Sequence, residues 1–386
     1  MGCQACRQSE PEETFLPYNE DDIKNLDKQN FTTTEKKEDY NKFIAYFENN
    51  LSALGNYFQN DFTTLIPPKI LEYITENPFS LNPELLNSLE SYEMKPVEFN
   101  NGNVYQGGWN RNLKMEGQGK YYLKEDGVLA EGIWKEGNLI YARVFITKDD
   151  DSFDIYEGNM KYSKFNGKGK LIQSDGQIYE GDFEDGEKNG ICKIIYNDGT
   201  LYEGQIEKDI LKGKGKMLWK NGYEYEGNFD KNKFNGNGIL KGPNNDIYEG
   251  GFLNNLFNGE GKYIYNNGNL YEGQFLYGIK KGKGIYKCNN LYEYEGDWDN
   301  DLPCGVGKLL TWDNNGCIKS TWRYGKIMEE PFYDKGNNDN FEGINFNFVC
   351  DEMLLSVKNL SNLELTESIQ TTQYKLGTVP SFLDDE

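Results

Sequence analysis

Between residues 100 and 325, apolar and polar side chains alternate with a period of two. In the segment YEGQF, Tyr271, Gly273 and Phe275 fall on one side, and the two polar residues between them fall on the other. The segment 259–265 alternates in the same way. Asp-Gly and Asn-Gly pairs, which favour tight turns, separate such segments from the next YEG. The pattern therefore predicts short strands that form β-hairpins, and hairpins that pair edge to edge.

These hairpins recur as an internal repeat of 23 residues. A glycine follows each YEG tyrosine after eleven residues, usually as part of a GxG triplet such as Gly236 and Gly238. A bare strand position leaves room for an aromatic ring to lie flat over the backbone. Looser copies begin at Tyr105, Ala130 and Ile318. A fixed period of this length indicates a repeat array. The tyrosines that begin the seven regular copies, and that we expect to form an aromatic face, are Tyr156, Tyr179, Tyr202, Tyr225, Tyr248, Tyr271 and Tyr294.

This pattern resembles the MORN repeat family. The resemblance rests on YEG followed by x-F or x-W, together with GxG at a steady interval, over residues 100–325. It implies an all-β repeat array: an elongated single-layer antiparallel sheet of stacked β-hairpins that serves as a scaffold, tethers membranes to the cytoskeleton or holds partner peptides. Ala130 and Ile318 depart from the pattern, as do the 26-residue interval after Ala130 and the acidic loop 148–154. These departures predict that the second repeat and the terminal repeat are degenerate, as expected of capping units.

The flanks of the array have a helical period instead. In residues 34–94, apolar side chains from Tyr40 to Leu54 follow one helical stripe, and Pro67-Pro68 and Asn82-Pro83 are helix starts. We therefore predict a helical module there. Residues 1–33 are expected to be a lipidated, largely disordered N-terminus.

Residues 326–386 are predicted to be a C-terminal cap with a helix over 348–366 and a flexible tail. Val349, Met353, Leu354, Val357 and Leu360 have helical spacing in that segment. Because a one-layer sheet has an aromatic face to cover, both flanking helical segments are expected to pack on it. The alternative is a surface that receives a helix of a partner protein.

Composition excludes several classes of function. A net charge of -22 argues against nucleic-acid binding, which needs clustered Lys and Arg. No apolar run is long enough to cross a bilayer. Seven cysteines without paired CxxC spacing suggest reduced thiols. The chain has no histidine, which removes Ser-His-Asp and Cys-His catalysis and most catalytic zinc sites.

Neither an enzyme nor a bound cofactor or metal is expected. The glycine-rich segments do not match GxxxxGK[ST], and loop 148–154 lacks the glycine and the distal Glu of a calcium loop. The flanks outside the array are short and carry no catalytic motif.

Lysines of the array are the candidate partner-binding or lipid-binding residues. They lie one or three residues after the repeat glycine and would form a basic stripe opposite the aromatic face; the resemblance implies that such a stripe binds anionic headgroups. The favoured alternative is pairing with the glutamates of the YEG motifs on adjoining strands, at roughly 0.2–1 kcal/mol a pair and without any ligand. The lysines are Lys168, Lys170, Lys193, Lys214, Lys216, Lys262, Lys283 and Lys308.

The N-terminal sequence MGCQACRQSE predicts a lipid anchor. Gly2 becomes the terminus once Met1 is removed, which suits myristoylation, although Cys6 stands where the pattern has Ser or Thr. The start resembles those of dually acylated signalling proteins, with Cys3 and Cys6 as palmitoylation sites. A single myristoyl chain binds membranes marginally, with K on the order of 10⁴ M⁻¹, so a second chain is needed. The alternative is a disordered terminus with incidental cysteines.

The sequence therefore predicts a non-enzymatic scaffold, anchored at the cytoplasmic face of a membrane such as the plasma or ciliary membrane, or at a membrane–cytoskeleton junction. It would hold protein partners there. Two alternatives remain: an accessory structural subunit of a ciliary or microtubule-based assembly without lipid, in the cytoplasm or cytoskeleton, and a regulatory module for a lipid kinase.

Overall fold

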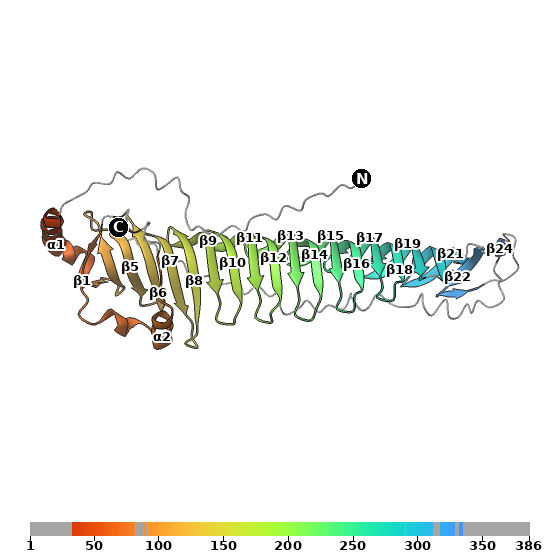
Figure 1. Cartoon of the computed structure of the whole chain (residues 1–386), viewed down its shortest axis with the longest axis horizontal. Helices are drawn as coiled ribbons and strands as arrows, with labels where there is room; N and C mark the ends of the chain where they lie inside the picture. The colour runs from red at the N-terminus through yellow and green to blue at the C-terminus, as the bar shows by residue number, and fades with distance from the viewer. Residues whose placement is uncertain are drawn as a thin grey trace, which may run out of the picture. The chain divides into compact units, whose positions relative to one another are not determined.

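The computed structural model describes residues 33–81, 86, 89, 91–289, 291–311, 317–328 and 332–334. These fall into two compact units, the first ending at Ser174 and the second starting at Asp175. Each unit is built on an open antiparallel sheet in which successive hairpins pair side by side, so the predicted all-β repeat array is confirmed (Figure 1). Gly2, Cys3, Cys6, the predicted helix 348–366 and the Asn82-Pro83 helix start lie outside the described residues.

The first unit contains the helical segments and the first hairpins of the array. Pro68 occupies the first turn of α2, as the sequence predicts, and Asn77 closes that helix by donating its backbone N–H to Tyr73. The helical elements are α1 (Thr33–Leu54), η2 (Phe62–Leu65) and α2 (Pro68–Glu76). The strands are β1 (Gly55–Tyr57), β2 (Tyr92–Glu93), β3 (Val97–Phe99), β4 (Val104–Trp109), β5 (Met115–Leu123), β6 (Val128–Lys135), β7 (Asn138–Thr147), β8 (Phe153–Lys161) and β9 (Lys164–Ile172).

The second unit consists of strands in its described part. They are β10 (Ile178–Glu184), β11 (Glu187–Ile195), β12 (Leu201–Glu207), β13 (Ile210–Leu218), β14 (Glu224–Asp230), β15 (Lys233–Lys241), β16 (Ile247–Leu253) and β17 (Leu256–Ile264). They continue with β18 (Leu270–Leu276), β19 (Ile279–Cys288), β20 (Tyr292–Asp299), β21 (Leu302–Thr311), β22 (Cys317–Arg323), β23 (Lys326–Ile327) and β24 (Phe332–Asp334).

In six of the seven YEG repeats a pair of glycines accommodates the tyrosine ring of the same repeat; in the Tyr179 repeat Cys192 replaces one of them. Gly227 on β14 pairs with Gly238 on β15, and the ring of Tyr225 lies over both. A Cβ atom built on Gly238 would lie 2.6 Å from the Tyr225 hydroxyl and 2.7 Å from its Cε2 atom. Phe234 stacks on the ring at a centroid distance of 3.6 Å. The predicted role of these glycines, space for a flat ring, is therefore confirmed.

Two kinds of turn connect the strands. The predicted Asp-Gly and Asn-Gly turns precede four of the seven YEG strands, and their glycines have positive φ, as at Gly199 (88°). The opposite turns have two residues, both with positive φ, such as Lys231 (51°) and Asn232 (63°). The Asn232 Oδ1 atom accepts the backbone N–H of Leu211 in the preceding hairpin at 2.7 Å. Asp209, Asn255 and Asp301 make the same link between neighbouring hairpins.

The N-terminal helical module packs on the aromatic face only in part, which corrects the expectation for that module, while the other flanking segment, 348–366, lies outside the described residues. α1 contacts that face, because Phe47 packs edge-on against Trp109 at 5.0 Å. α2 lies on the opposite face of the sheet, where Ile70 and Ile74 form a cluster with side chains of β4, β6, β7 and β8. The reason is that aliphatic and aromatic side chains also occupy the strand positions next to each tyrosine position in this unit, and those side chains face away from the tyrosines.

Candidate partner-binding face

The seven YEG tyrosines are structural. Each has an exposed side-chain fraction of 0%. Each hydroxyl donates a hydrogen bond to the backbone carbonyl three residues further along, over distances from 2.6 Å at Tyr156 to 3.3 Å at Tyr294. Burial raises the pKa of Tyr225 and of Tyr248, so both hydroxyls remain protonated donors. A partner on this side would therefore not contact the predicted tyrosine rings.

We expect Tyr225→Phe to weaken the repeat by about 1 kcal/mol, because it leaves the Asn228 carbonyl without its 2.8 Å hydrogen bond while keeping the ring. Amide hydrogen exchange in β14 and β15 measures the effect. Tyr277→Phe is the control, since that side chain is 64% exposed in a turn and should change nothing measurable. Equal effects of the two variants would contradict a role for the buried hydroxyl.

The lysines and glutamates on the other face form one row, which we call the charged row. In register across β10–β13 it reads Glu180, Lys193, Glu203 and Lys216. Lys193 lies 3.4 Å from Glu203, whereas Lys216 reaches Glu224 at 2.8 Å rather than either glutamate opposite it. These side chains are largely exposed, so each ion pair contributes about 1 kcal/mol at most.

The other predicted lysines differ in their pairing. Lys283 lies 2.7 Å from Asp297, and Lys308 lies 3.8 Å from Glu295. Lys214 and Lys262 make no ion pair with any residue that the structure describes. Lys168 and Lys170 are exposed on β9. The register therefore fits cross-strand pairing for part of the stripe and leaves Lys214 and Lys262 available to a ligand.

A second row on the same face is apolar and was not predicted as a surface. It is formed by the residue just before a YEG tyrosine and by its cross-strand partner wherever both are aliphatic; before Tyr225 and Tyr294 that residue is a glutamate instead. Across β10–β13 we call it the aliphatic row: Ile178, Ile195, Leu201 and Leu218, in direct register. Ile195 is 37% exposed and the other three side chains are half-buried. An aliphatic residue stands one place before five of the seven tyrosines, and this recurrence is the sequence signal that could have revealed the row.

The charged row also borders a groove of about 650 Å³ near the end of the second unit. Val306, one of the residues that line it, is 67% exposed. The lining combines three lysines with three glutamates, so the groove has no dominant charge. Its residues are Glu260, Glu272, Gly273, Lys283, Gly284, Ile285, Glu295, Gly296, Val306, Gly307, Lys308 and Lys319.

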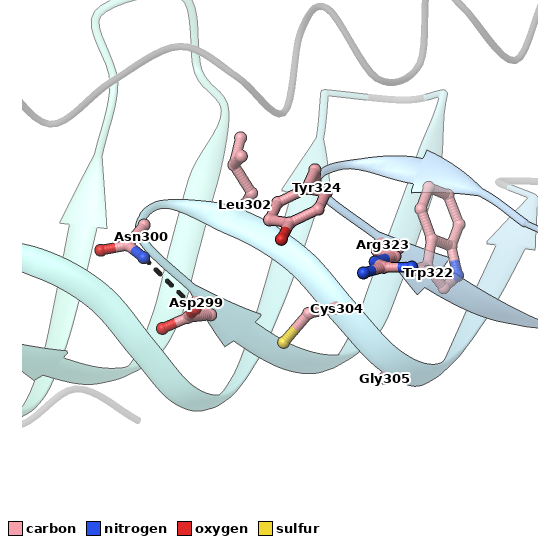
Figure 2. Close-up of a pocket in the computed structure, with 8 residues that line it drawn as sticks. All are labelled: Asp299, Asn300, Leu302, Cys304, Gly305, Trp322, Arg323 and Tyr324. Atoms are coloured by element: carbon pink, nitrogen blue, oxygen red, sulfur yellow. Dashed lines mark hydrogen bonds between the residues drawn. The ribbon is translucent and has the colours of Figure 1, made fainter.

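A smaller pocket of about 280 Å³ lies between the β20–β21 turn and the β22–β23 turn (Figure 2). It contains a thiol, Cys304, but burial and the carboxylates of Asp297 and Asp299 raise the pKa of that thiol. The thiol is therefore protonated at neutral pH and is a poor nucleophile. The lining residues are Asp299, Asn300, Leu302, Cys304, Gly305, Trp322, Arg323 and Tyr324.

Lys280 is a basic group with a lowered pKa, a property that often marks catalytic lysines. Burial lowers the pKa of its amine to about 8, against the opposing charge of Asp301. The side chain is 0% exposed, and its Nζ atom lies 4.8 Å from the centroid of the Trp298 ring and 5.4 Å from that of Tyr271. No substrate can reach the amine in this conformation, so the position is structural.

Within the described ranges, no three His, Cys, Asp or Glu side chains lie close enough together to hold a metal ion. Among the helices that the structure describes, none has the length and apolar character needed to span a membrane.

Comparison with known proteins supports the repeat assignment. Seven segments match the MORN repeat, and each begins at a predicted tyrosine: 156–178, 179–201, 202–222, 225–247, 248–270, 271–290 and 294–315. This part of the chain is therefore a MORN-like repeat array. No curated protein sequence matches the chain.

Solved structures with some likeness include two CPAP domains. The SAS-4 (dCPAP) TCP domain of Drosophila melanogaster, in complex with a proline-rich motif of Ana2, is 15% identical with a TM-score of 0.26, covering 47% of this chain and 90% of that domain. The TCP10 domain of Danio rerio CPAP, in complex with a STIL peptide, is 12% identical with a TM-score of 0.26, covering 64% of this chain and 100% of that domain. At these scores their peptide ligands do not carry over to this chain.

Proposed function

We propose, on the premise that residues 156–315 form seven MORN repeats, that this protein is a non-enzymatic scaffold held at the cytoplasmic face of a membrane. Acyl chains on Gly2, Cys3 and Cys6 provide the anchor, and the sheet face with the charged row holds protein partners.

The observation that carries the partner-binding part is the exposed face of the second unit. Four aliphatic side chains lie in register beside four alternating charges on β10–β13, on the side away from the buried tyrosines. Half-exposed apolar groups beside charges give a surface both an area to bury and a way to orient a partner. Because the buried tyrosines stabilise each hairpin from the other side, this face is free to vary without loss of the fold.

The anchor is supported by the sequence MGCQACRQSE and by the absence of a basic cluster after it, since Arg7 stands alone before an acidic stretch. Electrostatic attraction to an anionic leaflet is therefore not available, and acyl chains supply the affinity at about 0.8 kcal/mol per buried methylene. Two or three acyl chains are therefore favoured over one.

We expect Gly2→Ala to abolish myristoylation and to move the full chain from the membrane fraction of cells to the soluble fraction. Replacement of Cys3 and Cys6 together by Ser should leave weak, transient binding, and hydroxylamine treatment of the wild-type protein should reproduce it by cleaving thioesters. Raising the salt concentration should change little, because no ionic attraction is screened. Cys317→Ser is the matched control, since it removes a thiol from the array.

If Gly2→Ala remains on the membrane to the wild-type extent, the lipid anchor is wrong. A soluble wild-type protein that sediments with microtubules would then support the alternative, an accessory subunit of a ciliary or microtubule-based assembly.

A further inference from the structure

The aliphatic row of the second unit has a covered counterpart in the first unit. The equivalent positions of β5–β8 are those next to a tyrosine position or next to its cross-strand partner. The side chains in register there are Tyr122, Leu129, Phe145 and Ile155. Leu129 and Phe145 are 0% exposed, because η2 and α2 pack over them. Ile66, Ile70 and Ile74 supply the apolar side chains of that cover.

The charged row of the first unit also takes part in this helix contact. It reads Lys120, Glu131, Arg143 and Glu157. Arg143 is buried between Glu131, to which its Nε atom donates at 2.7 Å, and the end of α2, where its Nη1 atom donates to the Asn77 carbonyl at 2.7 Å. A cation of the charged row thus caps the negative end of the helix.

The second unit has the same two rows on β10–β13. Glu180, Lys193, Glu203 and Lys216 take the place of the first unit's charged row, and the aliphatic row takes the place of the side chains under α2. The difference is burial: Ile195 is 37% exposed where Phe145 is 0% exposed. The surface that binds a helix in one unit is therefore present, and accessible, in the other.

We propose that the aliphatic row binds an amphipathic helix of a partner protein, with the last turn of that helix against Lys193 or Lys216. This inference rests on the proposed scaffold role and specifies the partner's chemistry. A helix that lies across strands spaced about 4.8 Å apart places one side chain per 5.4 Å turn over each strand. Four strands therefore fit about three turns, with Leu or Ile at i, i+4, i+7 and i+11.

The chain itself provides a probe, a fluorescent synthetic peptide of residues 62–77, which carries the three isoleucines that cover the row in the first unit. We expect it to bind the full-length protein, as measured by fluorescence anisotropy. The double variant Ile195→Asp/Leu201→Asp should weaken binding by about tenfold or more, because charged side chains replace the apolar contact. Ile191→Asp is the matched control, since Ile191 is 67% exposed on β11 of the same face but outside the row, and it should leave binding unchanged.

Absence of peptide binding to the wild-type protein, or equal binding by the double variant, would overturn the proposal. Two further results would identify a different occupant of the aliphatic row. Deletion of residues 335–386 that strengthens peptide binding would show that the chain's own C-terminal segment covers the row, and a wild-type dimer that the double variant converts to monomer would show that a second copy does. The membrane fraction of the double variant should equal that of wild type, so failure here is distinct from failure of the lipid anchor.

Discussion

In Gly238→Ala, the amides of β14 and β15 lose most of their protection against hydrogen exchange, and the repeat is destabilised by about 3 kcal/mol. The added methyl group would lie 2.6–2.8 Å from the Tyr225 ring, which has no space to move because Phe234 stacks on it at 3.6 Å. Either the ring leaves its site or the two strands separate. Loss of a buried aromatic ring from a core costs about 3–5 kcal/mol, and overpacking costs about 1–3 kcal/mol. Hydrogen exchange is the suitable measurement, because repeat arrays open locally.

A double-mutant cycle tests whether the ring causes this effect. In a Tyr225→Ala background the clash disappears, so Gly238→Ala should then cost nothing or stabilise the strand slightly. Gly236→Ala serves as a second comparison, because its Cβ would meet its nearest neighbour, Asn228, only at 3.5 Å. Its φ of +86° still makes alanine unfavourable, by about 1–2 kcal/mol, with or without the ring. Additive effects of Tyr225→Ala and Gly238→Ala would show that the glycine is needed for another reason.

The sequence predicted the repeat, the hairpins and the two faces, because each depends on local periodicity. Tyr271, Gly273 and Phe275 alternate with polar residues, and the structure places Tyr271 and Phe275 in the core with Glu272 exposed. Seven copies in phase make such a pattern hard to misread. The family match to seven segments begins at the same tyrosines.

The position of α2 could not be predicted from periodicity, because the side chains under it belong to separate hairpins. Leu129 and Ile155 each look like ordinary strand residues, and only their equivalent places before Ala130 and Tyr156 show that they share a face. The links between turns were missed for a different reason. Asn232 and Asn255 recur at the repeat interval, so the signal was present in the sequence, but the bond from the Asn232 side chain to the Leu211 amide requires the hairpin register.

The burial of Lys280 could not be predicted from the sequence either, because in the segment IKKGKG it resembles the neighbouring exposed lysines. It stands nine residues after its YEG tyrosine, where Phe234 and Phe257 stand in the two repeats before, and its aliphatic chain enters the same core. The burial of its amine therefore follows from its place in the repeat and not from its residue type.

We expect Lys280→Met to raise the free energy of unfolding at pH 7 and to remove part of its pH dependence. Burial lowers the pKa of Lys280 to about 8 in the fold, against 10.5 for the ordinary side chain. At pH 7 the folded protein therefore holds a buried ammonium group at a penalty of about 3 kcal/mol, which methionine avoids at similar size. Between pH 8 and 10.5 the unfolded chain binds a proton that the folded chain does not, so wild-type stability rises with pH across that window.

Thermal melts of the full chain at pH 7 and pH 9.5 measure this. The advantage of Lys280→Met over wild type should be largest at pH 7 and should shrink at pH 9.5, where the buried amine of the wild type is mostly neutral. Burial raises the pKa values of the nearby Tyr265 and Tyr271 hydroxyls well above this range, so neither of them titrates between pH 7 and pH 9.5. Lys281→Met is the matched control: that side chain is 48% exposed and pairs with Asp299 at 3.4 Å, so the variant should melt like wild type at both pH values. A Lys280→Met protein that is less stable than wild type at pH 7 would mean that the aromatic rings around the ammonium group stabilise it by more than its burial costs.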